Sequence, residues 1–286
     1  MTASMGPNRY GKDGIRLVLV RRGATPGGSD DLRDLTVDVR LDGDFDRVHT
    51  EGDNAPVLPT DTMRSTVYAM AHEHLTGAAE DFGAALAQRY LDAAPDAEEA
   101  EVTLREHAWT RTEVDGRPHP HAFTAGPAVT ATAVVTARRS GPAEVRSGIA
   151  GLTVLKTTDS AFSGFLHDEF TVLAETDDRI LATEVTADWG YLDGSTPSYD
   201  EVRARARTSL LESFAGHQSA SVQHTLFVMG DALLAACADV REVSMRMPNK
   251  HHIGVDLSPF GIDNDRAVFV ATDRPFGVIE GTVTRG

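Results

Sequence analysis

The same order of predicted elements, two strands followed by two helices and then further strands, occurs in both halves of the chain. In the first half, alternation of apolar and polar residues predicts strands over residues 15–20, 35–41, 102–104 and 129–135, and helical spacing predicts helices over residues 63–75 and 82–90. In the second half, strands are expected over residues 152–155, 180–185, 243–247, 252–257, 267–271 and 278–283, with helices over residues 199–214 and 222–238. The repeated order indicates duplication, although the two halves share no visible repeat of residues.

Runs of strands and runs of helices favour an α+β fold with antiparallel sheets over alternating βαβ units. A Gly- and Pro-rich stretch over residues 23–29 is expected to form the turn between the first two strands. The pattern breaks at Ser140-Gly141-Pro142, so we expect two tandem domains, residues 1–142 and 143–286. A four-stranded sheet with both helices on one face leaves its other face and two edges open, and joining such edges between subunits covers them. We therefore expect a homo-oligomer.

The chain carries a formal net charge of −16, from 27 lysines and arginines against 43 aspartates and glutamates. Such a surface repels nucleic-acid phosphates and anionic lipid head groups, so neither nucleic acid nor membrane is an expected partner. A small anionic ligand would also be repelled at long range. Its site would therefore have to be built from local cations and from backbone N–H groups at a helix N-terminus.

Sequence signals for the common cofactors and for export are missing. Cys237 is the only cysteine, which excludes an intramolecular disulfide and a multi-cysteine metal site. No Walker lysine pattern, dinucleotide fingerprint or Gly-x-Ser-x-Gly nucleophile elbow occurs. No apolar run approaches the length of a membrane span, the first ten residues lack a signal peptide's apolar core, and the last residues, Val283 to Gly286, carry no peroxisomal tripeptide. We expect a cytoplasmic protein.

Three pairs of histidines raise the question of a metal site. His72 and His74 lie two residues apart on a predicted helix and point roughly 200° apart, so they cannot chelate one ion as an i, i+4 pair does. His119 and His121 flank a proline after a predicted turn, where an extended loop accounts for them. We therefore expect neither these pairs nor His251-His252 to bind a metal.

Short distinctive segments are spread along the chain. They are Tyr10-Gly11-Lys12, Pro59-Thr60-Asp61-Thr62, Trp109-Thr110-Arg111, the run from Asp115-Gly116 to His121, Gly151 to Lys156, Phe162-Ser163-Gly164-Phe165, Asp178-Arg179-Ile180-Leu181, Ser221-Val222-Gln223 and Pro248-Asn249-Lys250-His251-His252. In order and approximate spacing, this set resembles the urate oxidase (uricase) family from Tyr10 to about Thr284. No single segment carries the resemblance, but the ordered set is specific.

The resemblance implies a fold and an assembly. Members of the family adopt the tunnelling fold (T-fold), in which each domain is an antiparallel four-stranded sheet with a helix pair on one face. Two such tandem domains in each chain assemble into a barrel-like homotetramer. The family's active sites lie between subunits, so the resemblance implies that Lys12 and Thr60 of one chain face Arg179 and Gln223 of its neighbour.

The activity that the resemblance implies is oxidation of urate by O₂ and water to 5-hydroxyisourate and H₂O₂, with no metal and no organic cofactor. The family's proton relay matches Lys12, Thr60 and His251. Urate is normally a monoanion and becomes a good reductant only after it loses another proton. A lysine with a lowered pKa can accept that proton, and a hydroxyl and an imidazole can pass it on.

The family's substrate contacts match a further set of residues. They are Thr60, Asp61, Phe162, Leu173, Arg179, Val222, Gln223 and Asn249. A guanidinium and an amide suit the polar edge of urate, an aromatic ring stacks on its plane, and the asparagine helps to hold oxygen or water above the ring. Without the resemblance, Lys12 would be expected on the surface and Phe162, Leu173 and Val222 in the core. The chain departs from the family at Pro59, where a small residue is usual, and proline removes a backbone N–H.

Two other functions fit the same residues. The first is another purine or pterin enzyme of the same fold, which could use a metal held by His119, His121 or His252. The second is an oligomer that binds a purine without catalysis. Activity on urate that survives a chelator argues against the first, and oxygen consumption argues against the second.

Overall fold

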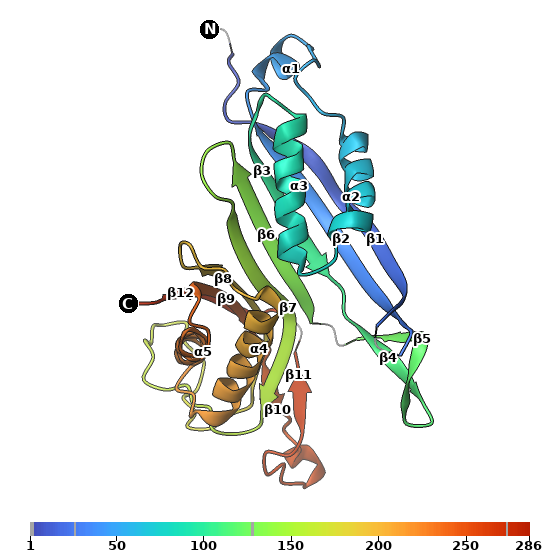
Figure 1. Ribbon diagram of the computed structural model, residues 1–286. Coiled ribbons are helices and arrows are strands. Elements are labelled where there is room, and N and C mark those ends of the chain that lie inside the picture. The colour runs from blue at the N-terminus through green and yellow to red at the C-terminus, as the bar shows by residue number, and fades with distance from the viewer. Residues whose placement is uncertain (1–2, 26, 127–128, 273) are drawn as a thin grey trace. The chain divides into compact units, whose positions relative to one another are not determined.

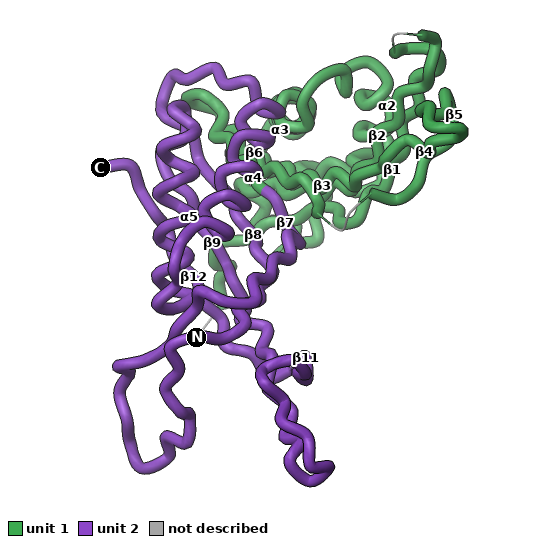
Figure 2. Tube along the Cα trace, turned by 90° about the horizontal axis from the view of Figure 1, so that it is seen from below, with its two compact units in different colours: residues 1–148 green, residues 149–286 purple. Residues whose placement is uncertain are grey.

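The computed structural model of the chain has two compact units, residues 1–148 (unit 1) and residues 149–286 (unit 2) (Figure 1 and Figure 2). The structure describes residues 3–25, 27–126, 129–272 and 274–286. The units divide within strand β7 (Glu144–Lys156), whereas the domain boundary expected after residue 142 lies in the turn before this strand.

The sheet of unit 1 has the strand order β1-β2-β3-β6. Its strands are β1 (Arg9–Thr25), β2 (Ser29–Gly43), β3 (Ala97–Glu106) and β6 (Thr130–Arg138), and neighbouring strands are antiparallel. The expected turn over residues 23–29 includes Pro26, which lies outside the described residues, and Thr25 pairs with Ser29 across it. Helices α2 (Thr60–His74) and α3 (Ala79–Ala93) lie on one face of the sheet (Figure 1), and a short helix, α1 (Asp46–Thr50), precedes them.

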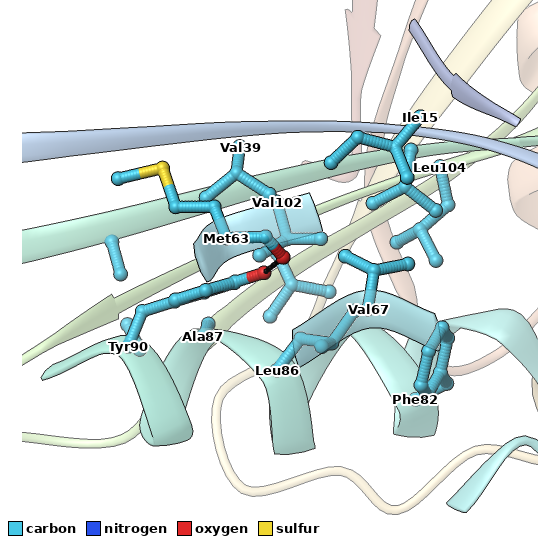
Figure 3. Packing of buried hydrophobic residues seen from close by; sticks show 14 of the residues in the cluster. Ile15, Val39, Met63, Val67, Phe82, Leu86, Ala87, Tyr90, Val102 and Leu104 are labelled. Atoms are coloured by element: carbon cyan, nitrogen blue, oxygen red, sulfur yellow. Dashed lines mark hydrogen bonds between the residues drawn. The ribbon is translucent and has the colours of Figure 1, made fainter. Parts of the chain in front are cut away.

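The helix-covered face of this sheet is apolar because apolar and polar residues alternate along β2. The buried residues of this strand include Leu35, Val37, Val39 and Leu41. Phe82 and Leu86 of α3 pack with them in one core (Figure 3). Tyr90 is also fully buried, and its hydroxyl donates a hydrogen bond to the Met63 carbonyl at 2.8 Å. This bond joins α3 to α2, so the predicted pair of helices over antiparallel strands is confirmed in unit 1.

A hairpin that the sequence pattern does not predict follows β3. It consists of β4 (Trp109–Val114) and β5 (Arg117–Ala125). Asp115 and Gly116 join the strands with φ values of 50° and 71°, which confirms the predicted turn at these residues. The extended loop expected after the turn is instead strand β5. Most of its side chains are exposed, so the alternation that marks a half-buried strand is missing.

The sheet of unit 2 has the strand order β7-β8-β9-β12, where β8 is Leu181–Tyr191, β9 is Val240–Asn249 and β12 is Gly277–Thr284. Its helices are α4 (Tyr199–Gly216) and α5 (Val222–Ala236). The four-stranded sheet and the pair of long helices in each unit therefore follow the predicted α+β order of two strands, two helices and two strands.

The strands expected over residues 252–257 and 267–271 are shorter than predicted. They are β10 (His252–Gly254) and β11 (Phe269–Ala271), which pair with each other in a separate two-stranded sheet. A 3₁₀ helix (Ser258–Phe260) interrupts the segment between them. The side-chain amide of Asn264 donates to the carbonyls of Val255 and Val268, both at 2.8 Å, and so replaces further strand pairing. In the part of the chain that the structure describes, no helix is long and apolar enough to cross a membrane.

Candidate active site

A pocket of about 170 Å³ lies in unit 2. It is formed by the connection between β7 and β8, the start of α5, the end of β9 with the residues after it, and the start of β12. The lining residues are Phe162, Leu173, Ala174, Thr176, Arg179, Val222, Gln223, Asn249, His251 and Ile279.

Phe162 and Arg179 both come from the connection between β7 and β8, which folds back on itself. The backbone N–H of Phe162 donates to the Thr176 carbonyl at 2.8 Å, and the reciprocal bond is 3.0 Å. The backbone N–H of Arg179 donates to the Ser160 carbonyl at 2.7 Å. With the backbone fixed in this way, the Cζ atom of Arg179 lies 5.6 Å from the centroid of the Phe162 ring, within the range of a cation–π contact.

Arg179 supplies positive charge to the pocket. Its Nε atom is buried and has no hydrogen-bond partner among the described residues. Burial lowers the pKa of Arg179 from its ordinary value, but a guanidinium keeps its charge in proteins. A buried guanidinium nitrogen without a protein acceptor favours a ligand that brings an anionic or carbonyl acceptor.

Val222 and Gln223 form the first turn of α5. The Ser221 hydroxyl caps this helix by accepting a hydrogen bond from the backbone N–H of His224 at 3.1 Å. Val222 is buried, whereas Gln223 is exposed. The cap therefore fixes the helix start at which Val222 and Gln223 line the pocket.

A buried pair of hydroxyls joins the start of α5 to the segment that carries Phe162. The Oγ atom of Ser219 lies 2.7 Å from Oγ1 of Thr225, and both residues are fully buried. The Thr225 hydroxyl donates to the Ser221 carbonyl at 3.0 Å. The Ser219 carbonyl accepts from the backbone N–H of Ala161, directly before Phe162, at 2.7 Å. One network thus holds two walls of the pocket.

Asn249 and His251 come from the end of β9 and the residues after it. Asn249 is the last residue of β9 and pairs with Thr183 on one side and Gly277 on the other. The His251 carbonyl accepts a hydrogen bond from the backbone N–H of Thr272 at 2.9 Å. His251 also lines the pocket.

Lys12 lies in unit 1, in strand β1, where it pairs with Val39 of β2. The register shifts between Lys12 and Ile15, as at a β-bulge. The preceding residue must be glycine, because a Cβ atom on Gly11 would lie 1.8 Å from the Val39 carbonyl oxygen. In the segment Tyr10-Gly11-Lys12, the backbone packing thus requires the glycine, whereas the role proposed for the lysine is chemical.

Thr60 and Asp61 begin helix α2, also in unit 1. Pro59 precedes the helix with a φ of −55°, a value that the proline ring favours. The hydroxyl of Tyr10 accepts a hydrogen bond from the backbone N–H of Leu58 at 2.8 Å. This bond ties β1 to the segment before Thr60. Asp61 forms an ion pair of 2.6 Å with the arginine three residues later.

Most of the residues singled out from the sequence meet in the unit 2 pocket. They are Phe162, Leu173, Arg179, Val222, Gln223, Asn249 and His251. Lys12, Thr60 and Asp61 lie in unit 1, and their place beside this pocket stays a prediction.

The remaining lining residues, Ala174, Thr176 and Ile279, carry no chemical signal in the sequence and are recognised only by position. Leu173 is 59% exposed, so it is not the core residue that its side chain alone would predict. Its apolar surface is available to a ligand or to another wall of the site.

The rings of His119 and His121 touch edge to face, with centroids 4.5 Å apart, on strand β5. Across the described ranges, no group of three or more His, Cys, Asp or Glu side chains is placed to hold a metal ion.

Comparison with known proteins links both units to one family. The uricase family model matches residues 8–136 and 145–280. A uricase from Arthrobacter globiformis is 41% identical over 281 residues, which cover 98% of this chain and 90% of the relative. A uricase from Aspergillus flavus is 35% identical and covers 97% of this chain and 95% of the relative.

Solved structures agree with these sequence matches. The crystal structure of the Arthrobacter globiformis uricase has a TM-score of 0.92 at 40% identity, and the match covers 100% of this chain and 96% of that one. A uricase structure from Bacillus fastidious has a TM-score of 0.83 at 22% identity, over 97% of this chain and 93% of that one, and shows the shared fold. The chain belongs to the uricase family.

Proposed function

We propose that the unit 2 pocket binds urate and that the chain oxidises it with O₂ and water to 5-hydroxyisourate and H₂O₂. Membership of the uricase family supports the reaction. The location is supported by one observation: the buried Nε of Arg179 has no protein acceptor within the described residues, and the guanidinium lies over the ring of Phe162.

The residues that line the pocket suit the chemistry of urate. Urate is flat, anionic and rich in carbonyl oxygens. Arg179 donates hydrogen bonds to adjacent acceptors on one edge, and the amide of Gln223 both donates to and accepts from the same edge. Phe162 stacks on the ring plane, and Val222 and Leu173 exclude water beside it. Asn249 faces the space above the ring, where it holds O₂ or water.

Proton transfer is assigned to Lys12, Thr60 and His251. Lys12 accepts the proton that converts the urate monoanion into the dianion, the Thr60 hydroxyl passes it on, and His251 carries it further. These groups suit the task because an amine, a hydroxyl and an imidazole can all accept a proton.

The proposed oxidation needs no metal or organic cofactor, because the substrate itself is the electron donor. The dianion gives one electron to O₂, the radical pair recombines as a peroxide at C5, and this peroxide takes back a proton from the relay to become the hydroperoxide. Loss of hydrogen peroxide and addition of water at C5 give 5-hydroxyisourate. Urate loses two electrons and O₂ gains two, so the step balances as urate, O₂ and H₂O to 5-hydroxyisourate and H₂O₂.

The complete site is proposed to lie between subunits of a T-fold homotetramer, with Lys12, Thr60 and Asp61 of one chain opposite Arg179 and Gln223 of another. Two observations support this arrangement. The pocket volume of about 170 Å³ is below the ~300–1,000 Å³ of complete small-molecule sites. Strand β1 lies at one end of the strand order of unit 1 and β12 at one end of that of unit 2, and both carry exposed apolar residues such as Val18 and Val278, as edges that pair with another chain do.

The test follows loss of the urate ultraviolet band together with O₂ uptake and peroxide formation, in the wild type and in Arg179→Gln. We expect all three signals in the wild type, in equal amounts, and a large loss in the variant. A wild-type protein that leaves urate unchanged contradicts the proposed function. Unchanged kinetics in Arg179→Gln contradict the proposed site.

The same assay separates the alternatives. Activity that is lost after exhaustive treatment with a chelator and restored by a metal would indicate a metal enzyme. Tight binding of urate without O₂ uptake would indicate a binding protein. We expect full activity after chelation.

A further inference from the structure

A second arginine, Arg266, binds the residue directly before Arg179. Its Nη2 atom donates to Oδ2 of Asp178 at 2.6 Å and to the Asp178 carbonyl at 3.1 Å. Arg266 belongs to the segment between β10 and β11, whereas Asp178 belongs to the connection between β7 and β8. The contact therefore joins two segments of unit 2 that are far apart in the sequence.

The carboxylate of Asp178 has further donors. The Thr158 hydroxyl donates to Oδ2 at 2.9 Å, and the backbone N–H of Ser160 donates to Oδ1 at 3.4 Å. The hydrogen bond from Arg266, and then that from Thr158, hold the pKa of Asp178 below its ordinary value despite partial burial. Asp178, directly before Arg179 in the sequence, is therefore negatively charged at neutral pH. Arg266 neutralises this charge.

The segment that carries Arg266 has a defined and uncommon backbone. Asp265 and Arg266 have φ values of 42° and 56°, two successive residues in the left-handed region that L side chains rarely adopt. The Asn264 side chain supports this conformation, because its Oδ1 accepts from the backbone N–H of Val268 at 2.7 Å and its amide donates to two carbonyls. These bonds brace the backbone of the loop from which the Arg266 side chain reaches Asp178.

Arg179 and Asp178 are neighbours in the sequence and carry opposite charges. If the Asp178 carboxylate turned to Arg179, it would compete with an anionic ligand for the guanidinium. If it stayed where it is without a counter-ion, it would repel that ligand. Pairing with Arg266 avoids both outcomes.

We propose that Arg266 is a positioning residue for substrate affinity: by pairing with Asp178, it leaves the charge of Arg179 available to the anionic substrate. This inference rests on the proposed function, because it requires an anion at Arg179. Arg266 is not among the described residues that line the pocket, so it acts through Asp178.

The test compares Arg266→Gln with the double variant Asp178→Asn/Arg266→Gln. Asparagine keeps the shape of Asp178 and one acceptor oxygen but removes the charge. The matched control is Arg241→Gln, which removes another half-exposed arginine of unit 2 that is paired with Asp193 at 3.7 Å. Urate binding is measured by calorimetry under anaerobic conditions, and KM and kcat are measured in air.

Arg266→Gln is expected to weaken urate binding and raise KM by about two- to fivefold, the scale of partly exposed charge interactions, with kcat within about twofold of the wild type. The control is expected to behave as the wild type, and the double variant to recover most of the lost affinity. Wild-type affinity in Arg266→Gln would overturn the proposal. So would a loss that the double variant does not reverse, because the loop and not the charge would then be responsible. A wild type that neither binds nor oxidises urate would instead contradict the proposed function itself.

Discussion

The hydroxyl of Tyr10 accepts a hydrogen bond from the backbone N–H of Leu58 at 2.8 Å, and this bond joins the strand that carries Lys12 to the segment that leads into Thr60. Burial raises the pKa of Tyr10, and the bond from Leu58 lowers it by less. The hydroxyl therefore stays neutral and links the segments that carry Lys12 and Thr60, two residues of the proposed relay.

Tyr10→Phe is expected to lower kcat by roughly threefold or more and to change KM less. The substitution keeps the aromatic ring but leaves the Leu58 N–H without its acceptor, at a cost of about 1–3 kcal/mol. Steady-state kinetics measure the effect. Tyr68→Phe, on a half-exposed residue of α2, is the control, and equal kinetics in the two variants would show that the Tyr10 bond does not position the relay.

Arg179→Lys is expected to raise the KM for urate by about ten- to a hundredfold, nearly as much as Arg179→Gln. Lysine keeps the charge but lacks the planar fork that donates two parallel hydrogen bonds. Initial rates at varied urate concentrations measure KM. A lysine variant close to the wild type would mean that charge alone, without the fork, holds the substrate.

Thr225→Val is expected to raise the KM for urate and to lower the apparent free energy of unfolding by about 1–3 kcal/mol. Valine has the same shape but breaks the hydroxyl network among Ser219, Ser221 and Thr225 that joins two walls of the pocket. Thr225→Ser should restore both KM and stability. Thr208→Val, on an exposed position of α4, controls for a change of helix propensity. A KM that stays at the wild-type value in Thr225→Val would limit the network to a role in stability.

Asp34→Asn is expected to destabilise the protein at pH 7 and much less in acid. Asp34 is only 2% exposed and accepts two hydrogen bonds from Arg16, both 2.7 Å, and one from Trp109 at 2.9 Å. Burial raises its pKa, but the bonds from Arg16 and Trp109 together lower it below the ordinary value.

A carboxylate whose pKa is lower in the folded state stabilises the fold above its unfolded pKa and loses this contribution as the pH falls through the folded pKa. The difference in the free energy of unfolding between wild type and variant should therefore be about 1–3 kcal/mol at pH 7 and should narrow below about pH 4. Urea unfolding followed by tryptophan fluorescence measures it at each pH. Asp53→Asn removes an exposed partner of Arg47 and should show little effect at any pH. If the loss of unfolding free energy in Asp34→Asn does not change with pH, the ionisation of Asp34 is not its cause.

The elements predicted correctly are those with one buried face. Residues 35–41 alternate strictly, and that alternation is the buried face of β2. Strand β5 was not predicted, because its side chains are mostly exposed on both faces. Strands β10 and β11 are shorter than predicted because the Asn264 side chain binds backbone groups that a longer ladder would pair.

Some site residues could be predicted from the sequence through the family resemblance, and others could not. Phe162, Val222 and Gln223 have ordinary alternative roles in a core or in a first helical turn, and only the ordered resemblance to one family singles them out. Arg266 has no such signal, because its contact with Asp178 depends on the left-handed backbone at residues 265 and 266. A tertiary ion pair of this kind follows from the fold and not from a local pattern.

In the proposed assembly, Lys12 of one chain and Arg179 of another serve the same active site. Mixing Lys12→Met chains with Arg179→Gln chains, each expected to be nearly inactive alone, tests this arrangement when urate oxidation is measured after dissociation and reassembly of a 1:1 mixture. If each site takes its two parts from different chains, random assembly gives about a quarter of the sites both intact residues, and about a quarter of the wild-type activity should return. A reassembled mixture of confirmed mixed oligomers that stays as inactive as its components would contradict the claim.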